Sequence, residues 1–260
     1  MPRTLSLKPR YYRWHVDPGV DWTEANTTYN FLDWKLPMER VAVVALDVWQ
    51  THYLTETRDR IQAITAGRIR PLLKVVRSSG LSLIHAPGPR VALEHPNWVR
   101  MIREDEVEWP VHDTWPPREF IGRTGEFAVY GHPVEPRQPE LDVRLTQRRF
   151  HPLSEPIGDE PVVANGEELH RYCRAHGFLF LIFYGFNTNY CMMLNDYGMI
   201  HMNNRGYATI LLRDCTTGME SFESGVRHGQ TRMAIQHLEM SQRFSITAPE
   251  LIAALRQGRN

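Results

Sequence analysis

The chain has 260 residues, 42% of them hydrophobic and 23% charged, so it can bury a full core and is typical of a soluble globular protein. Its 30 basic and 30 acidic residues cancel, which argues against a nucleic-acid or membrane-surface partner and favours small molecules or proteins. No basic-then-apolar leader opens the chain, and no apolar run could span a bilayer, so we expect a cytoplasmic protein. The three cysteines form no CxxC pair, and we expect no disulfide framework, cofactor or metal.

The first 35 residues are rich in aromatic side chains but show neither helical nor alternating periodicity. This pattern fits an N-terminal arm, residues 1–35, that packs over the body or over a neighbouring subunit, and it fits a partly ordered tail equally well. Residues 36–260 are interpreted as a single α/β domain. Within it, residues 88–157 are rich in proline and lack a sustained period, which is more typical of a functional cover or an interface than of a linker.

Apolar runs and helical spacings alternate along the rest of the chain. The run "RVAVVALDVW", residues 40–49, is β-branched and apolar, as expected for a strand buried on both faces of a parallel sheet. The helical pattern that follows ends at Gly80 and is interrupted by Pro71. The alternation predicts a three-layer, Rossmann-like α/β fold with a mostly parallel six-stranded sheet and helices on both faces. The predicted strands lie in 40–49, 81–89, 161–165, 178–186, 207–215 and 243–247, and the predicted helices in 57–80, 166–177, 190–206, 220–241 and from 249 onward.

Three reactive side chains follow predicted strands. Asp47, His85 and the turn that holds Cys191 all fall at carboxyl ends of strands, which in a parallel sheet meet at the edge where ligands bind. A carboxylate after an apolar strand is costly unless it is hydrogen-bonded or functional, so we favour a functional Asp47 over a turn or cap role. Cys191 would begin a helix, where free amides and the dipole favour a thiolate. A small buried hydrophobe is the alternative interpretation of this cysteine.

Two segments, "VAVVALDVWQTHY" and "FLIFYGFNTNYCMMLNDYGMIHMNNRGYATILLRDCTTG", carry a family resemblance. The second segment combines a strand, a Gly-hydrophobic-x-Thr-Asn-x-Cys turn, a helix, and a strand that ends in an aspartate. Together they resemble the isochorismatase-like cysteine hydrolases, which include nicotinamidases, N-carbamoylsarcosine amidases, ureidoacrylate hydrolases and biuret hydrolases. The resemblance covers residues 40–87 and 161–247 and leaves out the N-terminal arm and residues 88–157.

The resemblance implies a reaction and the residues that carry it. Cys191 would be the nucleophile and Asp47 the general base, and a small amide, ureido or other C–N substrate would be hydrolysed through a thioester. Backbone amides of the turn before Cys191 would form an oxyanion hole, and a cis peptide bond is expected between the first two turn residues. Family members usually form homo-oligomers, so a dimer or tetramer is implied. The turn residues carried over are Phe186, Asn187, Thr188 and Tyr190.

The family's third catalytic residue, a lysine before the 166–177 helix, is absent here. Its matching position is Gly158, Ala164 or Asn165, depending on the alignment. Loss of the cation should raise the pKa of the thiol beside a carboxylate, because like charges oppose a second ionisation. Three interpretations stay open: a nearby basic side chain supplies the charge, Asn165 positions substrate by a hydrogen bond alone, or the site has moved from hydrolysis to binding. The candidate basic residues are Arg148, Arg149, His151 and His170.

Several other side chains are candidates for the pocket, each with an ordinary structural alternative. His52 follows Asp47 in sequence, and His85 ends a strand, but the Asp-x-His grouping of a metal site is missing, so no metal is expected. The further pocket candidates are Asn165, Arg149 and His151. As an alternative to a hydrolase, the chain would be a catalytically silent family member that binds a small ligand or serves as an oligomeric partner.

Overall fold

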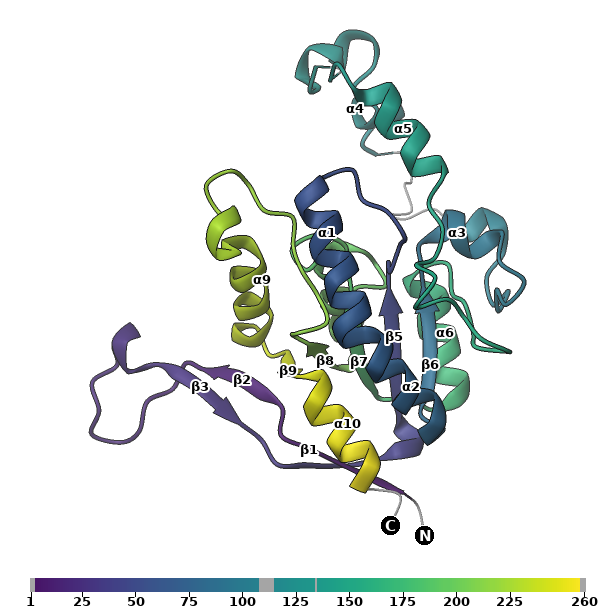
Figure 1. Cartoon of the computed structure of the whole chain (residues 1–260). Helices are drawn as coiled ribbons and strands as arrows, with labels where there is room; N and C mark the ends of the chain where they lie inside the picture. The colour runs from purple at the N-terminus through teal and green to yellow at the C-terminus, as the bar shows by residue number, and fades with distance from the viewer. Residues whose placement is uncertain (1–2, 108–114, 134, 258–260) are drawn as a thin grey trace.

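The computed structural model describes residues 3–107, 115–133 and 135–257. A seven-stranded sheet with the order β3-β2-β9-β8-β7-β5-β6 forms its centre (Figure 1), and β1 pairs with β4 in a second, two-stranded sheet. Strands β9, β8, β7, β5 and β6 run parallel, so their carboxyl ends lie at one edge. The strands are β1 (Thr4–Leu7), β2 (Arg10–Arg13), β3 (Thr28–Phe31), β4 (Trp34–Pro37), β5 (Val41–Leu46), β6 (Ser82–Ala86), β7 (Phe180–Gly185), β8 (Ala208–Leu212) and β9 (Phe244–Ile246).

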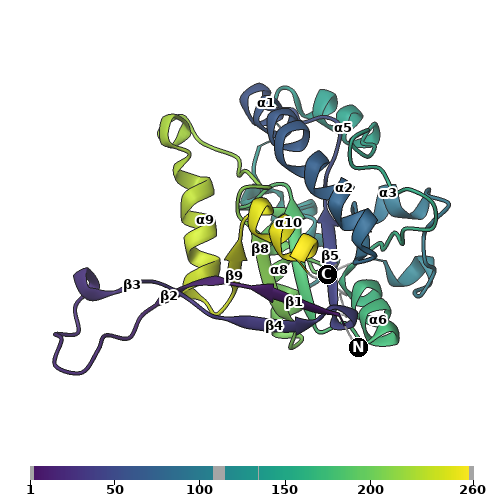
Figure 2. The same cartoon turned by 60° about the horizontal axis from the view of Figure 1, so that its bottom comes forward.

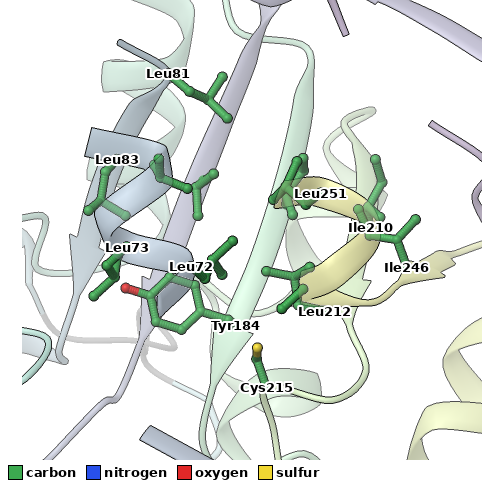
Figure 3. Close-up of a cluster of buried hydrophobic side chains, with 14 of the residues drawn as sticks. Leu72, Leu73, Leu81, Leu83, Tyr184, Ile210, Leu212, Cys215, Ile246 and Leu251 are labelled. Carbon is green, nitrogen blue, oxygen red and sulfur yellow. The ribbon is translucent and has the colours of Figure 1, made fainter. Parts of the chain in front are cut away.

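Helices cover both faces of this sheet (Figure 2). On one face α2 and α10 bury Leu72, Leu73 and Leu251 against sheet residues such as Tyr184 (Figure 3), and Ile61 of α1 joins the same cluster. On the other face α6, α8 and α9 contribute a second apolar cluster that includes Leu169. The three-layer α/β architecture predicted from the sequence is therefore confirmed. The helices are α1 (Thr55–Ile64), α2 (Arg70–Ser79), α3 (Pro89–Leu93), α4 (Arg118–Ile121), α5 (Gln138–Thr146), α6 (Gly166–His176), α7 (Cys191–Leu194), α8 (Met199–Asn204), α9 (Gly229–Met240) and α10 (Ala248–Gln257).

The central strand β5 explains why its sequence is apolar without alternation. All six of its residues are buried. Val41, Val43 and Ala45 join the cluster on one face of the sheet, and the intervening residues join the cluster on the other. A strand covered on both faces needs apolar side chains at every position.

None of the helices in the described residues is long and apolar enough to cross a membrane.

The sheet differs from the prediction in its number of strands. Residues 161–165 form no strand, and only isolated bridges join Val162 to His85 and to Trp98. Instead, β2 and β3 of the N-terminal arm extend the opposite edge in antiparallel fashion, with Arg10 opposite Ser245 of β9. The predicted count of six is therefore wrong. Four-residue strands such as β2 and β3 are too short to show an alternating pattern in the sequence.

Two of the predicted long helices are shorter or interrupted. A π-helical turn, Thr65–Ile69, separates α1 from α2, and Pro71 stands in the first turn of α2, where its missing N–H donor is not needed. The helix predicted from residue 220 begins only with α9. The carboxylate of Glu220 instead accepts hydrogen bonds from the amides of Gln230 and Thr231 at the start of α9, at 2.9 and 3.0 Å.

The described residues of the insertion, 88–107, 115–133 and 135–157, contain only short helices, in agreement with their irregular sequence. The helices α4 and α5 bury none of their own residues and stand away from the sheet (Figure 1). Residues 108–114 and 134 of this insertion lie outside the described residues. The end of the insertion returns to the sheet, because Phe150 forms an antiparallel bridge with Trp49, just beyond β5.

His85, a candidate pocket residue, belongs to a polar network at the β6 edge of the sheet. Its Nε2 lies 2.9 Å from Glu160 Oε2, and Arg77 Nε donates to Glu160 Oε1 at 2.7 Å. Burial alone would raise the pKa of Glu160, but the hydrogen bonds from Arg77 and His85 outweigh it and hold this pKa at about 2. The network ties the loop that carries Glu160 to α2 and β6.

Replacing Glu160 with glutamine should destabilise the fold in a pH-dependent way. The depressed pKa means that the ionised network stabilises the protein at neutral pH and loses its contribution as the pH falls from 4.5 toward about 2. At pH 7 we expect Glu160→Gln to lower the free energy of unfolding by about 1–3 kcal/mol. Urea denaturation at pH 7 and pH 3 should show the difference shrinking at the lower pH. Glu140→Gln, in an exposed pair with Arg137, is the control and should leave the free energy of unfolding unchanged within the error of the measurement. An equal loss at both pH values would contradict the assignment.

Candidate active site

Asp47 lies directly after the last residue of β5 and has a left-handed backbone conformation, with φ +49°. Such a conformation is costly for most residues with a side chain, although aspartate tolerates it better than most. The Asp47 amide donates to the carbonyl of Ala86, at the end of β6, at 3.0 Å. The residue is 1% exposed, so its carboxylate is held away from water at the carboxyl edge of the sheet.

The backbone at the end of β7 closely approaches the backbone at the end of β5. Gly185 has φ +130°, and a Cβ added there would lie 1.8 Å from the carbonyl oxygen of Leu46. Only glycine fits this close approach, since any side chain would push the two backbones apart. The next amide, that of Phe186, donates to the same carbonyl at 3.1 Å. The peptide bond between Phe186 and Asn187 is cis, which confirms that prediction.

The loop after β8 holds the turn that leads to the cysteine. The Thr188 amide donates to the carbonyl of Thr217 at 3.0 Å, and its hydroxyl lies 2.7 Å from that of Thr216. The Asn189 side chain accepts from the amide of Met219 and donates to its carbonyl, each at 2.9 Å. These bonds fix the turn to a second strand end, so its backbone amides have set directions.

Cys191 begins α7 and is 7% exposed. The Asp47 carboxylate and the Asn187 amide lie close enough to Cys191 to shift the pKa of its thiol, the carboxylate upward and the amide downward. The amides of Thr188 and Tyr190 donate to backbone carbonyls. In the described part of the chain, the amides of Asn187 and Cys191 donate to no backbone carbonyl, and the Asn187 amide lies beside the sulfur.

Asp47 has two further partners that the sequence interpretation missed. Tyr197 Oη donates to Asp47 Oδ1 at 3.1 Å, and Asn195 Nδ2 donates to Asp47 Oδ2 at 3.1 Å. Both residues were placed inside a predicted helix, 190–206, whereas the structure breaks it between α7 and α8. Gly198 is the signal that could have shown the break, because a Cβ there would lie 2.8 Å from the carbonyl oxygen of Cys191.

Burial sets the ionisation of both reactive groups. It raises the pKa of Asp47 to about 7, against hydrogen bonds from Cys191, Tyr197 and Asn195 and the charge of Arg148. The pKa of Cys191 lies well above its usual range, first because the thiol is buried and second because the Asp47 carboxylate is adjacent. The four-residue α7 offers little helix dipole, so the thiolate expected from the helix start is not favoured. The pKa of the thiol is raised, as expected, and the causes are burial and the Asp47 carboxylate.

A cavity of about 310 Å³ opens onto this pair, and Arg148 is part of its wall. Arg148 is the only one of the four candidate basic residues that lines it, as far as the described residues show. Its guanidinium carbon lies 3.8 Å from the centre of the Trp49 ring. The positive charge lowers the pKa values of both Asp47 and Cys191 relative to burial alone. The other residues of the wall are Trp49, Pro87, Gly88, Pro89, Arg90, Val91, Leu145, Tyr190, Asn195 and Tyr197.

The other predicted candidates lie outside this wall and have partners of their own. Arg149 is exposed and donates to the carbonyl of Arg148 at 2.7 Å. His151 Nε2 lies 2.8 Å from Gln62 Oε1, and His170 Nδ1 lies 2.9 Å from Tyr207 Oη. Asn165 caps α6, where its side chain accepts from the amide of Glu168 at 2.9 Å.

His52 does not line the cavity at Cys191 but lies close to it. It borders a small cavity that adjoins Arg148, and its Nδ1 accepts from the amide of Leu54 at 3.1 Å. Burial lowers the pKa of His52, so the ring is neutral at physiological pH. Within residues 3–107, 115–133 and 135–257, no group of three or more His, Cys, Asp or Glu side chains is placed to hold a metal ion.

Comparison with known proteins identifies the family. The sequence model of the isochorismatase domain matches residues 41–246, so the chain belongs to the isochorismatase family. It is similar in structure to a cysteine hydrolase from Pseudomonas syringae pv. phaseolicola, with 15% identity and a TM-score of 0.56 over 86% of this chain and 96% of that one. An isochorismatase family protein from Desulfovibrio vulgaris has 14% identity and a TM-score of 0.51, over 84% and 98% of the two chains. No curated protein matches the sequence. Family membership supports a hydrolase role.

The pH dependence of Cys191 alkylation should follow the ionisation of Asp47. The charged carboxylate accepts the thiol proton, so we expect the rate with iodoacetamide to rise with pH through about 7. Tyr197→Phe removes a hydrogen bond to the charged form and should move this inflection up by about one pH unit. Tyr190→Phe, on a half-exposed ring of the same cavity, is the control and should leave it in place. The same profile in all three proteins would contradict the role of Tyr197.

Proposed function

We propose that the protein is a cysteine-dependent hydrolase of a small amide, ureido or other C–N substrate and acts through a thioester intermediate. One observation carries this proposal: Cys191 and Asp47, from the ends of two neighbouring strands, lie together on the wall of one cavity, close enough for each to shift the pKa of the other. A nucleophile within reach of a base with a pKa of about 7 is the arrangement that covalent catalysis requires.

In the first half of the reaction, the Cys191 sulfur attacks the carbonyl carbon as its proton passes to Asp47. The new carbon–sulfur bond converts the carbonyl oxygen to an oxyanion, which would accept hydrogen bonds from the amides of Asn187 and Cys191, neither of which donates to a backbone carbonyl in the described residues. Collapse of this intermediate breaks the carbon–nitrogen bond. Asp47 returns the proton to the leaving nitrogen, so ammonia or an amine departs and a thioester remains.

In the second half, water replaces the amine. Asp47, again ionised, takes a proton from the water as its oxygen attacks the thioester carbon, and the carbon–sulfur bond then breaks. The proton returns to the sulfur, so the free thiol is regenerated and the net reaction is an amide plus water giving an acid plus an amine. Tyr197 and Asn195 keep the carboxylate in position through both halves. Turnover falls as the pH drops through about 7, because a protonated Asp47 cannot act as the base.

Arg148 is our choice for the positive charge that the family's lysine would supply. Its charge favours the anionic forms of both Asp47 and Cys191, which are the forms that the reaction needs. The side chain reaches the cavity from the returning end of the insertion rather than from a strand of the sheet. Of the interpretations left open by the sequence, a nearby basic side chain is therefore the one that the geometry supports.

The alternative function is a catalytically silent protein that binds a small ligand. The observation in its favour is the raised pKa of Cys191, which leaves the resting thiol protonated. The alkylation profile separates the two candidates. An inflection near 7 indicates proton transfer to Asp47 and supports the hydrolase, whereas a rate that rises only above 9, the ordinary thiol value, favours the silent protein.

Intact mass after brief exposure to a panel of small amides and ureides tests the hydrolase directly. We expect a covalent acyl adduct on the wild type, none on Cys191→Ser, and turnover reduced by about a hundredfold or more in Asp47→Asn. Cys173→Ala, at a buried cysteine of α6, is the control and should keep the adduct. No adduct and no turnover across the panel would refute the proposal, and so would an adduct that survives in Cys191→Ser.

We also propose that the protein acts as a homo-oligomer, a dimer or a tetramer. Several large apolar side chains are exposed on the single chain, among them Trp22 at 70%, Phe222 at 98% and Val226 at 94%. Exposed apolar groups of this size are often covered by a partner. Size-exclusion chromatography with light scattering should give a mass of at least twice 30.3 kDa, and a mass of 30.3 kDa would contradict the proposal.

A further inference from the structure

The backbone around Arg148 is paired with the segment that follows β5. The amide of Gln50 donates to the carbonyl of Arg149 at 3.1 Å, and the amide of His151 donates to the carbonyl of Val48 at 2.9 Å. These bonds flank the antiparallel bridge between Trp49 and Phe150. Arg148 is thus attached to the same short segment that carries Asp47, and its position relative to the reactive pair is set by backbone hydrogen bonds.

The Trp49 ring is a fixed platform for the guanidinium. Its Nε1 donates to the carbonyl of Pro87 at 3.0 Å, which orients the indole. Arg148 stacks on this ring, with its guanidinium carbon 3.8 Å from the ring centre. Stacking covers one face of the guanidinium but leaves the N–H groups at its edge free to donate.

The charges in this cavity are not balanced. Arg148 and Arg90 both line it, and in the described residues no carboxylate lies within 4.0 Å of either guanidinium. Cys191 and Tyr197 are neutral because burial raises their pKa values, and Asp47, with a pKa of about 7, carries at most one negative charge. Two positive charges therefore face at most one negative charge.

We propose that the substrate carries a carboxylate in addition to the C–N bond that is cleaved, and that Arg148 binds this carboxylate with help from Arg90. This inference rests on the proposed function for the reaction, but the recognition of an anion beside Cys191 can be tested without turnover. The flat N–H edge of a guanidinium matches the two oxygens of a carboxylate. A cavity of about 310 Å³ with apolar walls from Trp49 and Leu145 suits a small organic acid.

Alkylation of Cys191 by an anionic and a neutral reagent tests this inference. Iodoacetate and iodoacetamide deliver the same carbon to sulfur and differ in whether a carboxylate or a carboxamide is attached. We expect the ratio of the iodoacetate rate to the iodoacetamide rate to be about tenfold higher at Cys191, followed by peptide mass, than for free cysteine in the same buffer. In Arg148→Gln the ratio should fall to the free-cysteine value, and in Arg148→Lys it should fall only part of the way.

The matched control is Arg149→Gln, which removes the same charge one residue away at a side chain outside the cavity, and it should keep the wild-type ratio. A wild-type ratio equal to that of free cysteine would overturn the inference. An equal drop in the Arg148 and Arg149 variants would overturn it as well, because that result would reflect overall charge alone.

Binding to the Cys191→Ser variant gives a second, independent measurement. Titration calorimetry compares malonamate, succinamate and glutaramate with their neutral diamides, so the carboxylate is the only difference within each pair. We expect at least one acid to bind about tenfold more tightly than its diamide, and the preference to disappear when Arg148→Gln is added. Equal binding within every pair would refute anion recognition. Failure of the proposed function is distinct from this, since it would appear as a Cys191 that forms no acyl adduct while the preference for the acid persists.

Discussion

The burial of the Asp47 carboxylate is the constraint on which the rest of the site depends. A charged group in this position is costly, so the structure surrounds it with donors, the Tyr197 hydroxyl and the Asn195 amide, and places the Cys191 thiol nearby. Even with these donors the pKa of Asp47 remains near 7, which keeps the carboxyl ready both to accept and to return a proton near neutral pH. The same burial keeps the Cys191 thiol protonated. The resting site therefore has no permanent thiolate, and the thiol proton can pass to the Asp47 carboxylate during the proposed reaction.

Two glycines make this arrangement sterically possible, and neither contributes chemistry. Gly185 lets the end of β7 touch the carbonyl of Leu46, which brings the cysteine turn against the residue before Asp47. Gly88 leaves room on the other side, since a Cβ there would lie 3.2 Å from the Tyr197 hydroxyl oxygen and 3.7 Å from Asp47 Oδ1. The geometry of the site therefore depends on the close backbone contacts that these two glycines allow, as well as on its reactive side chains.

The sequence allowed the prediction of those features that depend on patterns local to a strand or turn. The unalternating apolar runs indicated β5 and β7, and a carboxylate and a thiol after them indicated Asp47 and Cys191. Asn195 and Tyr197 were not predicted, because the apolar spacing of 190–206 continues through the break and Gly198, where the backbone closely approaches the Cys191 carbonyl, was the one residue that indicated it. Arg148 was one of several basic candidates. It reaches the cavity because two segments about 100 residues apart pair with each other, and such a pairing leaves no local pattern in the sequence.

The use of Arg148 in place of the family's lysine, as proposed above, changes what the positive charge can do. A guanidinium stays protonated at any physiological pH, so it stabilises anions but cannot take part in proton transfer. Every proton in the proposed reaction must therefore pass through Asp47, and the profile of turnover against pH should report this one carboxyl. Arg148 comes from the insertion and borders the cavity. It therefore favours the anionic forms of Asp47 and Cys191 and would also contact the substrate. A substrate carboxylate bound to Arg148 would offset part of this charge, so in the proposed reaction substrate binding and the ionisation of Asp47 and Cys191 both depend on the same side chain.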